Sequence, residues 1–251
     1  MAKIDKRQYS KEQWHEIREQ RKAEKEQRRI KKRQDIVVPE APKQKNNHHI
    51  AFVIGNGTSR SPIDIERLSP VGKIYGCNAM YRSFAPDYLV AVDAKMVLEI
   101  AKTGYQKKHQ LWTNPNRAYN RIPNLNLFNP SKGWSSGPTA LWLASQHQYE
   151  IIYILGFDYK GLEKGSKFNN LFADTPNYKK STDGATFFGN WLRQTASVLK
   201  QHSHIQYVRV IQPDNYKPEE LNKFDNFKTI SVDDFMKIFQ LLPRSSENGS
   251  F

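Results

Sequence analysis

The fold class of this chain is decided by the stretch Ile50-Ala51-Phe52-Val53-Ile54-Gly55-Asn56-Gly57-Thr58-Ser59. Its first five residues are a short apolar run, which is typical of a central parallel strand covered on both faces. Glycines and hydroxyl side chains follow directly, and exposed amide hydrogens at such a turn can face a phosphate. The stretch therefore predicts the first strand and phosphate-facing loop of an α/β nucleotide-binding domain. An ordinary strand-to-helix turn is the alternative interpretation.

Further strands and helices alternate after this stretch. Apolar runs predict strands over residues 73–77, 88–92, 110–113, 125–128, 151–155 and 205–211. Helices are predicted over residues 62–68, 94–101, 138–146, 185–201 and 232–240. Such alternation is typical of a Rossmann-like α/β domain, in which a mostly parallel sheet is flanked by helices.

The composition changes sharply near residue 36. Residues 1–35 are rich in Lys, Arg, Glu and Gln and contain no Gly or Pro. Ser10 and Gln13 match a capping box, which predicts a basic helical arm that runs to about residue 35. The domain organisation predicted from these changes is an arm over 1–35, a linker over 36–48, a Rossmann-like domain over 49–243 and a tail over 244–251.

The basic arm has two interpretations. Its apolar positions are too sparse for a continuous stripe, so it is either a solvated helix or a partly disordered segment. Alternatively, residues 3–33 bind nucleic acid or an acidic protein, since the formal net charge of the chain is +14.

The remaining composition limits the class of protein. The single cysteine, Cys77, excludes an internal disulfide and a cysteine-based zinc site. No apolar run approaches the roughly 20 residues that span a bilayer. The charged N-terminus lacks the apolar segment of a signal peptide, so we expect a cytoplasmic protein.

Polar residues also follow other predicted strands. Asn78 offers both a donor and an acceptor, which suits the edge of a base or ribose. Ser136 and Gly137 open a later helix, where an anion is favoured, and Asp158 follows the strand over 151–155. Ligands of open parallel sheets bind at the carboxyl ends of strands, so these side chains are expected to form one site. Taken singly, each is equally a turn or capping residue.

Acidic residues at strand ends allow another interpretation. Asp93 and Asp158 both follow strands, which would suit a metal-dependent phosphoryl or pyrophosphoryl transferase. Neither has a second carboxylate nearby at metal-site spacing, so the sequence does not indicate a metal site.

In sequence order, these motifs resemble those of the CMP-sialic-acid-dependent sialyltransferases of bacteria and of related uncharacterised proteins of tailed bacteriophages. The resemblance covers about residues 50–215 and leaves out the basic arm. The matching residues are Gly55-Asn56-Gly57-Thr58-Ser59, Ile63-Asp64, Cys77-Asn78, Ser136-Gly137 and Gly156-Phe157-Asp158-Tyr159.

The resemblance implies a nucleotide site and part of a catalytic site. The nucleotide-binding residues expected here are Asn56, Gly57, Ser59, Asn78, Ser136, Gly137 and Asp158. Tyr159 and Tyr178 are candidates to hydrogen-bond the leaving phosphate. The family has a histidine before its last long helix, whereas this sequence has Lys179-Lys180-Ser181. Lys180 is a poor base at neutral pH and is expected to stabilise phosphate charge instead.

Two functions follow from this reading. The first is a sialyltransferase-like glycosyltransferase or nucleotide-sugar-binding protein of bacteriophage origin, in the host cytoplasm or on the virion. Its donor would be a nucleotide sugar such as CMP-sialic acid, with no further cofactor and no metal. The alternative is a non-catalytic bacteriophage module whose basic arm binds nucleic acid or a protein.

Overall fold

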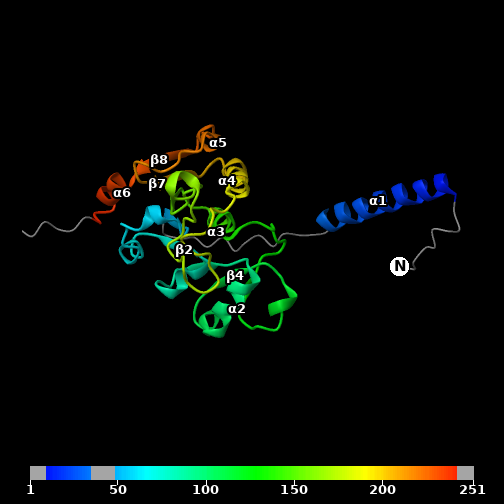
Figure 1. Cartoon of the computed structure of the whole chain (residues 1–251), viewed down its shortest axis with the longest axis horizontal. Helices are drawn as coiled ribbons and strands as arrows, with labels where there is room; N and C mark the ends of the chain where they lie inside the picture. The colour runs from blue at the N-terminus through cyan, green and yellow to red at the C-terminus, as the bar shows by residue number, and fades with distance from the viewer. Residues whose placement is uncertain (1–9, 35–48, 242–251) are drawn as a thin grey trace, which may run out of the picture. The chain divides into compact units, whose positions relative to one another are not determined.

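The computed structural model describes residues 10–34 and 49–241, which belong to two separate units of the chain, residues 1–40 and 41–251 (Figure 1). The predicted linker over 36–48 and the predicted tail over 244–251 lie outside the described residues.

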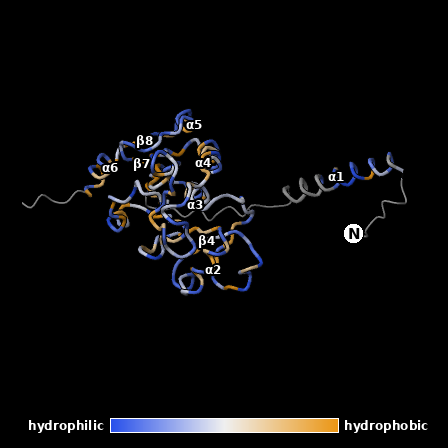
Figure 2. The backbone as a smooth tube through the Cα atoms, viewed as in Figure 1, coloured by the Kyte–Doolittle hydropathy of each residue, from blue (hydrophilic) through white to orange (hydrophobic). Residues whose placement is uncertain are grey.

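The first unit contains a single described helix, α1 (Lys11–Gln34). The Ser10 N–H donates to Gln13 Oε1 at 3.0 Å, and the Gln13 N–H donates to Ser10 Oγ at 3.2 Å. These two bonds are the reciprocal pair of a capping box, so the predicted helix start is confirmed. The described side chains of α1 are mainly hydrophilic, as the blue of the tube in Figure 2 shows.

The second unit is built on one parallel sheet of eight strands within residues 49–241, in the order β5-β4-β3-β2-β1-β6-β7-β8. The strands are β1 (Ile50–Ile54), β2 (Lys73–Cys77), β3 (Tyr88–Val90), β4 (Leu111–Thr113), β5 (Asn126–Leu127), β6 (Ile151–Leu155), β7 (Gln206–Ile211) and β8 (Phe227–Ser231). Every neighbouring pair is parallel. From β1 the strand order runs outward in both directions, so the topological switch point lies between β1 and β6.

The helices of this unit cover both faces of the sheet. The α-helices are α2 (Ala94–Lys102), α3 (Ser136–Gln146), α4 (Gly189–Gln201), α5 (Glu219–Asn222) and α6 (Val232–Ile238). The 3-10 helices are η2 (Thr58–Arg60), η3 (Glu66–Leu68), η4 (Asn78–Arg82), η5 (Tyr105–Lys107), η6 (Arg117–Tyr119) and η7 (Glu163–Gly165). The predicted Rossmann-like α/β class is therefore confirmed.

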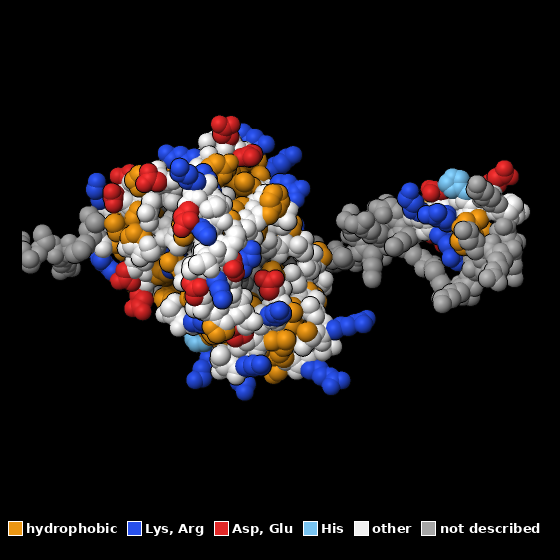
Figure 3. Space-filling view, viewed as in Figure 1, with side chains coloured by type: hydrophobic (Ala, Val, Ile, Leu, Met, Phe, Trp, Pro, Cys, Tyr) orange, Lys and Arg blue, Asp and Glu red, His pale blue; other side chains and the backbone are white. Residues whose placement is uncertain are grey.

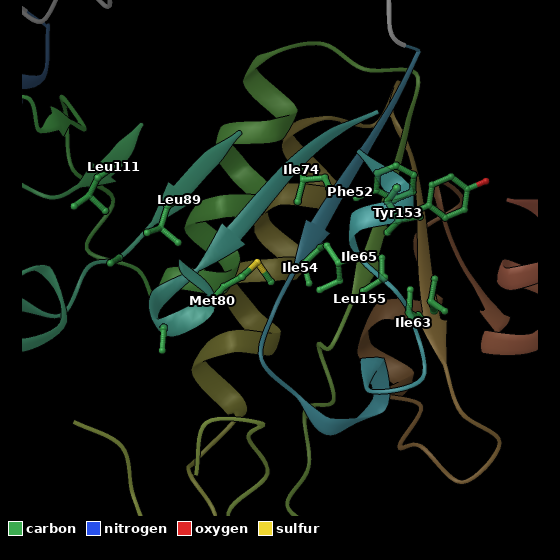
Figure 4. Packing of buried hydrophobic residues seen from close by; sticks show 14 of the residues in the cluster. Phe52, Ile54, Ile63, Ile65, Ile74, Met80, Leu89, Leu111, Tyr153 and Leu155 are labelled. Atoms are coloured by element: carbon green, nitrogen blue, oxygen red, sulfur yellow. The ribbon is translucent and has the colours of Figure 1, made fainter. Parts of the chain in front are cut away.

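Alternating strand residues divide the core into two clusters. Phe52, Ile74 and Leu89 project to one face of the sheet, as Figure 4 shows, where buried side chains of α2 and α6 cover them. Val53 and Tyr75 project to the other face, under α3 and α4. Burial on both faces explains why the central strands are almost continuously apolar.

Some elements differ from the sequence prediction. In place of the helix expected over 62–68, the structure has the short 3-10 helix η3, and the Asp64 side chain accepts the Glu66 N–H at its start at 3.1 Å. The last long helix begins at Gly189 rather than at Ala185. The chain before it is extended instead, since Gly184 forms an antiparallel bridge with Lys167 and the Ala185 N–H donates to the Ser166 carbonyl at 3.0 Å. Strand β8 was not predicted. It is a partly exposed edge strand whose polar residues hide its period.

The surface has mixed charge. On the face of residues 49–241 in Figure 3, basic side chains are interspersed with acidic ones, so no large basic patch there identifies an anion site. Within the two described ranges, no helix is long and apolar enough to cross a membrane.

Candidate functional site

A cavity of about 350 Å³ lies at the carboxyl ends of β1, β2, β3 and β6. The first turns of α3 and α4 complete its walls. It is lined by residues 55–57, 77–78, 92–93, 133–138, 156–158 and 169–170 and by Phe188, Asn190, Trp191 and Gln194. Its place at the switch point between β1 and β6 is where open α/β sheets bind ligands, and its volume is that of a small-molecule site.

Asn56 lines this cavity and holds a buried hydrogen-bond acceptor. Its Nδ2 donates to the Cys77 carbonyl at 3.0 Å and to the Tyr178 hydroxyl at 3.4 Å, which orients the amide. Asn56 is only 7% exposed, and its Oδ1 has no hydrogen-bond partner among the described residues. A buried acceptor without a partner costs about 1–3 kcal/mol, which a ligand donor would offset.

Asn78 presents a donor beside it. Asn78 has a positive φ of 52°, a conformation that asparagine tolerates better than most residues. Its Oδ1 accepts a hydrogen bond of 2.8 Å from the Ser136 hydroxyl, and that hydroxyl accepts the Val92 N–H at 3.1 Å. Within the described residues, Asn78 Nδ2 has no acceptor, so it is available to a ligand.

The first turn of α3 offers two backbone donors to the same cavity. Its N-cap residue, Ser135, makes no side-chain capping bond, and the N–H groups of Ser136 and Gly137 have no acceptor in the described parts of the chain. The Ser135 N–H itself donates to Gln194 Oε1 at 3.1 Å, which joins the starts of α3 and α4. Free N–H groups and the helix dipole favour an anion here.

The glycine loop after β1 has a different role from the expected one. The Gly57 N–H donates to a backbone carbonyl after β6 at 3.0 Å, the Thr58 N–H to Asn169 Oδ1 at 3.0 Å, and the Ser59 N–H to Asp158 Oδ2 at 3.2 Å. A Cβ atom on Gly57 would lie 2.5 Å from Asp158 Oδ2. The expectation that these amide hydrogens face a phosphate is therefore wrong, because groups after β6 accept them. The absence of a side chain at Gly57 instead allows the ends of β1 and β6 to approach closely.

Asp158 holds this loop in place. Its carboxylate also accepts the Ser59 hydroxyl and Asn169 Nδ2, the latter at 3.0 Å. Asp158 lines the cavity, but its oxygens are engaged within the protein, and Ser59 does not line the cavity.

Two buried arginines lie near Asp158. Burial lowers the pKa of Arg60 to about 10 and also lowers the pKa of Arg209, while the Asp158 carboxylate opposes the shift at both. Both guanidinium groups stay protonated at neutral pH. The cavity is lined by two carboxylates, Asp93 and Asp158, so the two arginines, neither of which lines it, balance this negative charge.

The three expected catalytic residues have different positions. Tyr178 lines a hollow of about 390 Å³ that shares Asn78 and Asp93 with the cavity. The Tyr178 hydroxyl accepts from Asn56 and from the Ala79 N–H at 3.3 Å, which leaves its own proton free to donate. Burial raises the pKa of Tyr178 to about 12, so the phenol stays protonated.

The structure places the other two away from the cavity. Tyr159 is buried, and its hydroxyl pairs with Thr195 Oγ1 of α4 at 2.9 Å. Lys180 is exposed in the loop before α4, where its N–H donates to Asp183 Oδ2 at 2.8 Å. Neither residue lines the cavity.

Asp93 is the cavity carboxylate without a partner inside the described residues. It is the N-cap residue of α2, but its side chain makes no capping bond. Asp93 and Asp158 share the cavity, yet the described residues contain no group of three or more His, Cys, Asp or Glu that could hold a metal ion.

Sequence reasoning missed one whole wall of the cavity. Trp134, Phe188, Asn190, Trp191 and Gln194 line it. Asn190 and Trp191 lie in the first turn of α4, and a helix start near the strand ends is the feature of the sequence that could have indicated them. The sequence predicts the start of this helix at Ala185, four residues before its actual start at Gly189.

The fold is similar to that of two solved sialyltransferases from Campylobacter jejuni. An alpha-2,3-sialyltransferase in apo form has 15% sequence identity over 72% of this chain and 80% of its own, with a TM-score of 0.43. The sialyltransferase CstII, in complex with the substrate analogue CMP-3FNeuAc, has 16% identity over 76% of this chain and 98% of its own, with a TM-score of 0.41. At these values the two structures indicate no function for this chain.

No protein-family model matches the chain, and no curated protein matches its sequence. The relation to bacteriophage proteins stays a prediction.

Proposed function

We propose that this chain binds a nucleotide sugar in the cavity and acts as a sialyltransferase-like glycosyltransferase. The observation that carries the proposal is the buried Asn56 Oδ1, which has no partner and belongs to a residue that lines the same cavity as Asn78, whose Nδ2 is free. An acceptor and a donor on residues of one cavity complement the edge of a base or ribose. The free N–H groups of Ser136 and Gly137 supply the place for the phosphate.

The charge of the cavity favours a donor with one phosphate. Among its described lining residues there is no Lys, Arg or His. A pyrophosphate needs cationic side chains or a metal ion to offset its charge, whereas a single phosphate suits a helix start. The positive charge of Arg60 and Arg209 acts from outside the lining. A cytidine monophosphate sugar meets this condition better than a nucleoside diphosphate sugar.

Transfer requires a base and a stabilised leaving group. In the proposed step, the acceptor hydroxyl oxygen bonds to the anomeric carbon of the donor sugar, and its proton passes to the Asp93 carboxylate. The bond between that carbon and the phosphate oxygen breaks, and the nucleotide leaves with the electron pair. The start of α3 and the Tyr178 hydroxyl stabilise the added negative charge. Asp93 thus takes the role of the histidine that the sequence lacks.

Calorimetric titration with CMP tests the binding half of the proposal. Asn56→Ala and Asn78→Ala are each expected to weaken binding by about 1–3 kcal/mol. Asn116→Ala, which removes a cap of η6 outside the cavity, is the matched control and leaves affinity unchanged. An intact protein without affinity for any nucleotide would contradict the proposal.

Incubation with CMP-sialic acid tests the catalytic half. Asp93→Asn is expected to reduce transfer or donor hydrolysis by about 10²-fold or more, the usual contribution of a general base. The loss of CMP affinity is expected to be far smaller. Undiminished turnover in Asp93→Asn would remove Asp93 from the mechanism.

We also propose that the basic arm binds nucleic acid. The observation in favour is its charge, since residues 1–35 hold 13 of the 39 Lys and Arg but 7 of the 25 Asp and Glu. Arg18, Arg21 and Lys22 are exposed on α1. Changing these three to Gln in the full chain is expected to reduce the salt dependence of DNA binding. The control changes Lys102, Lys107 and Lys108 to Gln, and equal effects of both triple variants would exclude the arm as the interface.

A further inference from the structure

The wall of the cavity next to α4 differs chemically from the wall at β1 and β2. Trp134, Phe188 and Trp191 line this side and are called the aromatic wall below. The rings of Phe188 and Trp191 lie 5.1 Å apart at 77° to each other. All three side chains are half-buried and pack against the core beneath α3 and α4, so the rings are supported from below.

Neutral amide donors surround the aromatic wall. Gln194 Oε1 accepts the Ser135 N–H, and Asn170 Oδ1 accepts the Phe172 N–H at 2.9 Å, which leaves the NH₂ group of each amide free. Asn190 Oδ1 accepts from Arg193, and its NH₂ group is likewise free. No cationic side chain joins these amides among the described lining residues. Two cations lie next to the wall without lining the cavity: Arg193 bonds to Asn190, and Lys132 Nζ lies 5.4 Å from the centre of the Trp134 ring. The side chains of the wall and the amides beside it are themselves uncharged.

This combination of groups is the chemistry that recognises a sugar ring. The face of an aromatic ring carries partial negative charge and attracts the C–H face of a pyranose, and free amides bond to its hydroxyl groups. We infer that the aromatic wall is a binding site for a neutral sugar. Its assignment as the acceptor site of transfer rests on the proposed function.

The position of the wall distinguishes it from the nucleotide site. The polar groups of Asn56 and Asn78 lie at the ends of β1 and β2, and α3 packs over these strands and against α4. The start of α3, where the phosphate is proposed to bind, is joined to α4 through Ser135 and Gln194. A sugar on the aromatic wall therefore lies next to the proposed phosphate. A nucleobase can also stack on such rings, and the test separates the two ligands.

The test uses the full chain and saturation-transfer difference NMR with galactose, N-acetylglucosamine and lactose, with and without CMP. One or more of these sugars is expected to bind, with the strongest transfer to the ring protons of its C–H face. Trp191→Leu is expected to weaken this binding at least about tenfold, and by more than it weakens CMP binding. Trp191→Phe, which keeps a ring, is expected to retain most of it. Trp112→Leu, on β4 outside the cavity, is the matched control.

The outcomes separate this inference from the proposed function. CMP binding without binding of any of the three sugars would overturn the sugar site and leave the nucleotide site standing. Sugar binding that depends on Trp191 in a protein that does not bind CMP would support the sugar site and overturn the nucleotide site. If Trp191→Leu weakens CMP binding as much as or more than sugar binding, the wall holds the base and the inference is wrong.

Discussion

The Ser136 hydroxyl donates a hydrogen bond of 2.8 Å to Asn78 Oδ1 and so connects the first turn of α3 to the end of β2. The same hydroxyl accepts the Val92 N–H after β3. A single small side chain thus orients one proposed ligand donor, Asn78 Nδ2, and satisfies a backbone group that would otherwise have no partner.

Ser136→Ala is expected to weaken CMP binding by about 1–2 kcal/mol, because the Asn78 amide loses the bond that orients it. The matched control is Ser145→Ala in the same helix, whose hydroxyl pairs with Tyr207 at 2.8 Å in the core. The control is expected to lower the free energy of unfolding without changing CMP affinity. Calorimetry and urea unfolding of both variants test this prediction, and equal CMP affinities of the two variants would refute it.

Gly57→Ala is expected to lower the free energy of unfolding by about 1–3 kcal/mol, the usual cost of overpacking. The new methyl group would meet Asp158 Oδ2 at 2.5 Å and the Gly156 carbonyl at 2.6 Å. Gly184→Ala is the control, because no atom lies within 4 Å of a Cβ at that position. Urea unfolding curves compare the two, and a Gly57→Ala protein as stable as the control would contradict the close approach.

Glu99 of α2 connects to the chain segment that precedes Tyr178. It accepts hydrogen bonds from Tyr81 at 2.6 Å, Arg82 at 2.5 Å and Asn177 at 2.5 Å. Arg82 also donates to Thr175 Oγ1 at 2.7 Å. Burial alone would raise the pKa of Glu99, but these hydrogen bonds outweigh it and hold the pKa below its ordinary value.

Glu99→Gln is expected to lower the free energy of unfolding by about 1–3 kcal/mol at neutral pH, between the values for exposed and buried ion pairs. Because the folded pKa is lowered, this stabilisation is present above about pH 4.3 and is lost as the pH falls through the pKa of Glu99. Urea unfolding of the wild-type and Glu99→Gln proteins, measured from neutral to acidic pH, tests whether their free energies of unfolding become equal at low pH. The control, Glu150→Gln, removes an exposed pair with His49 and is expected to cost less than about 0.5 kcal/mol. A constant difference down to the lowest pH would exclude Glu99 as the titrating group.

The half-buried His147 and the buried His202 are expected to make the free energy of unfolding depend on pH in a second way. Burial lowers the pKa of His147, whose Nδ1 lies 2.5 Å from the Tyr75 hydroxyl, and it also lowers the pKa of His202. Below about pH 6.5 the unfolded chain binds protons that the folded chain resists, so stability falls as the pH decreases. Unfolding measured at about pH 7.5 and about pH 5.5 is expected to show this loss. A His147→Gln, His202→Gln protein is expected to show less of it, and an unchanged slope would assign the effect to other groups.

The sequence by itself determined the parallel α/β class, the approximate strands and the start of α1. These features depend on local patterns: an apolar run such as Ile50–Ile54 needs burial on both faces, and the Ser10 and Gln13 bonds close within one turn. It also predicted that Asn56, Asn78, Ser136 and Gly137 lie together, because strand ends of a parallel sheet converge on one edge, and all four line the cavity.

Only the tertiary structure decided which polar groups remain available to a ligand. The N–H groups of Gly57, Thr58 and Ser59 donate to acceptors about a hundred residues away in the chain, so no local sequence pattern indicates that they are engaged. The aromatic wall likewise combines Trp134 with a helix start more than fifty residues later. Long-range packing decides whether a backbone donor is free and which side chains line the same wall of a cavity. For this physical reason, the sequence predicted where the candidate site lies but not which groups it offers to a ligand.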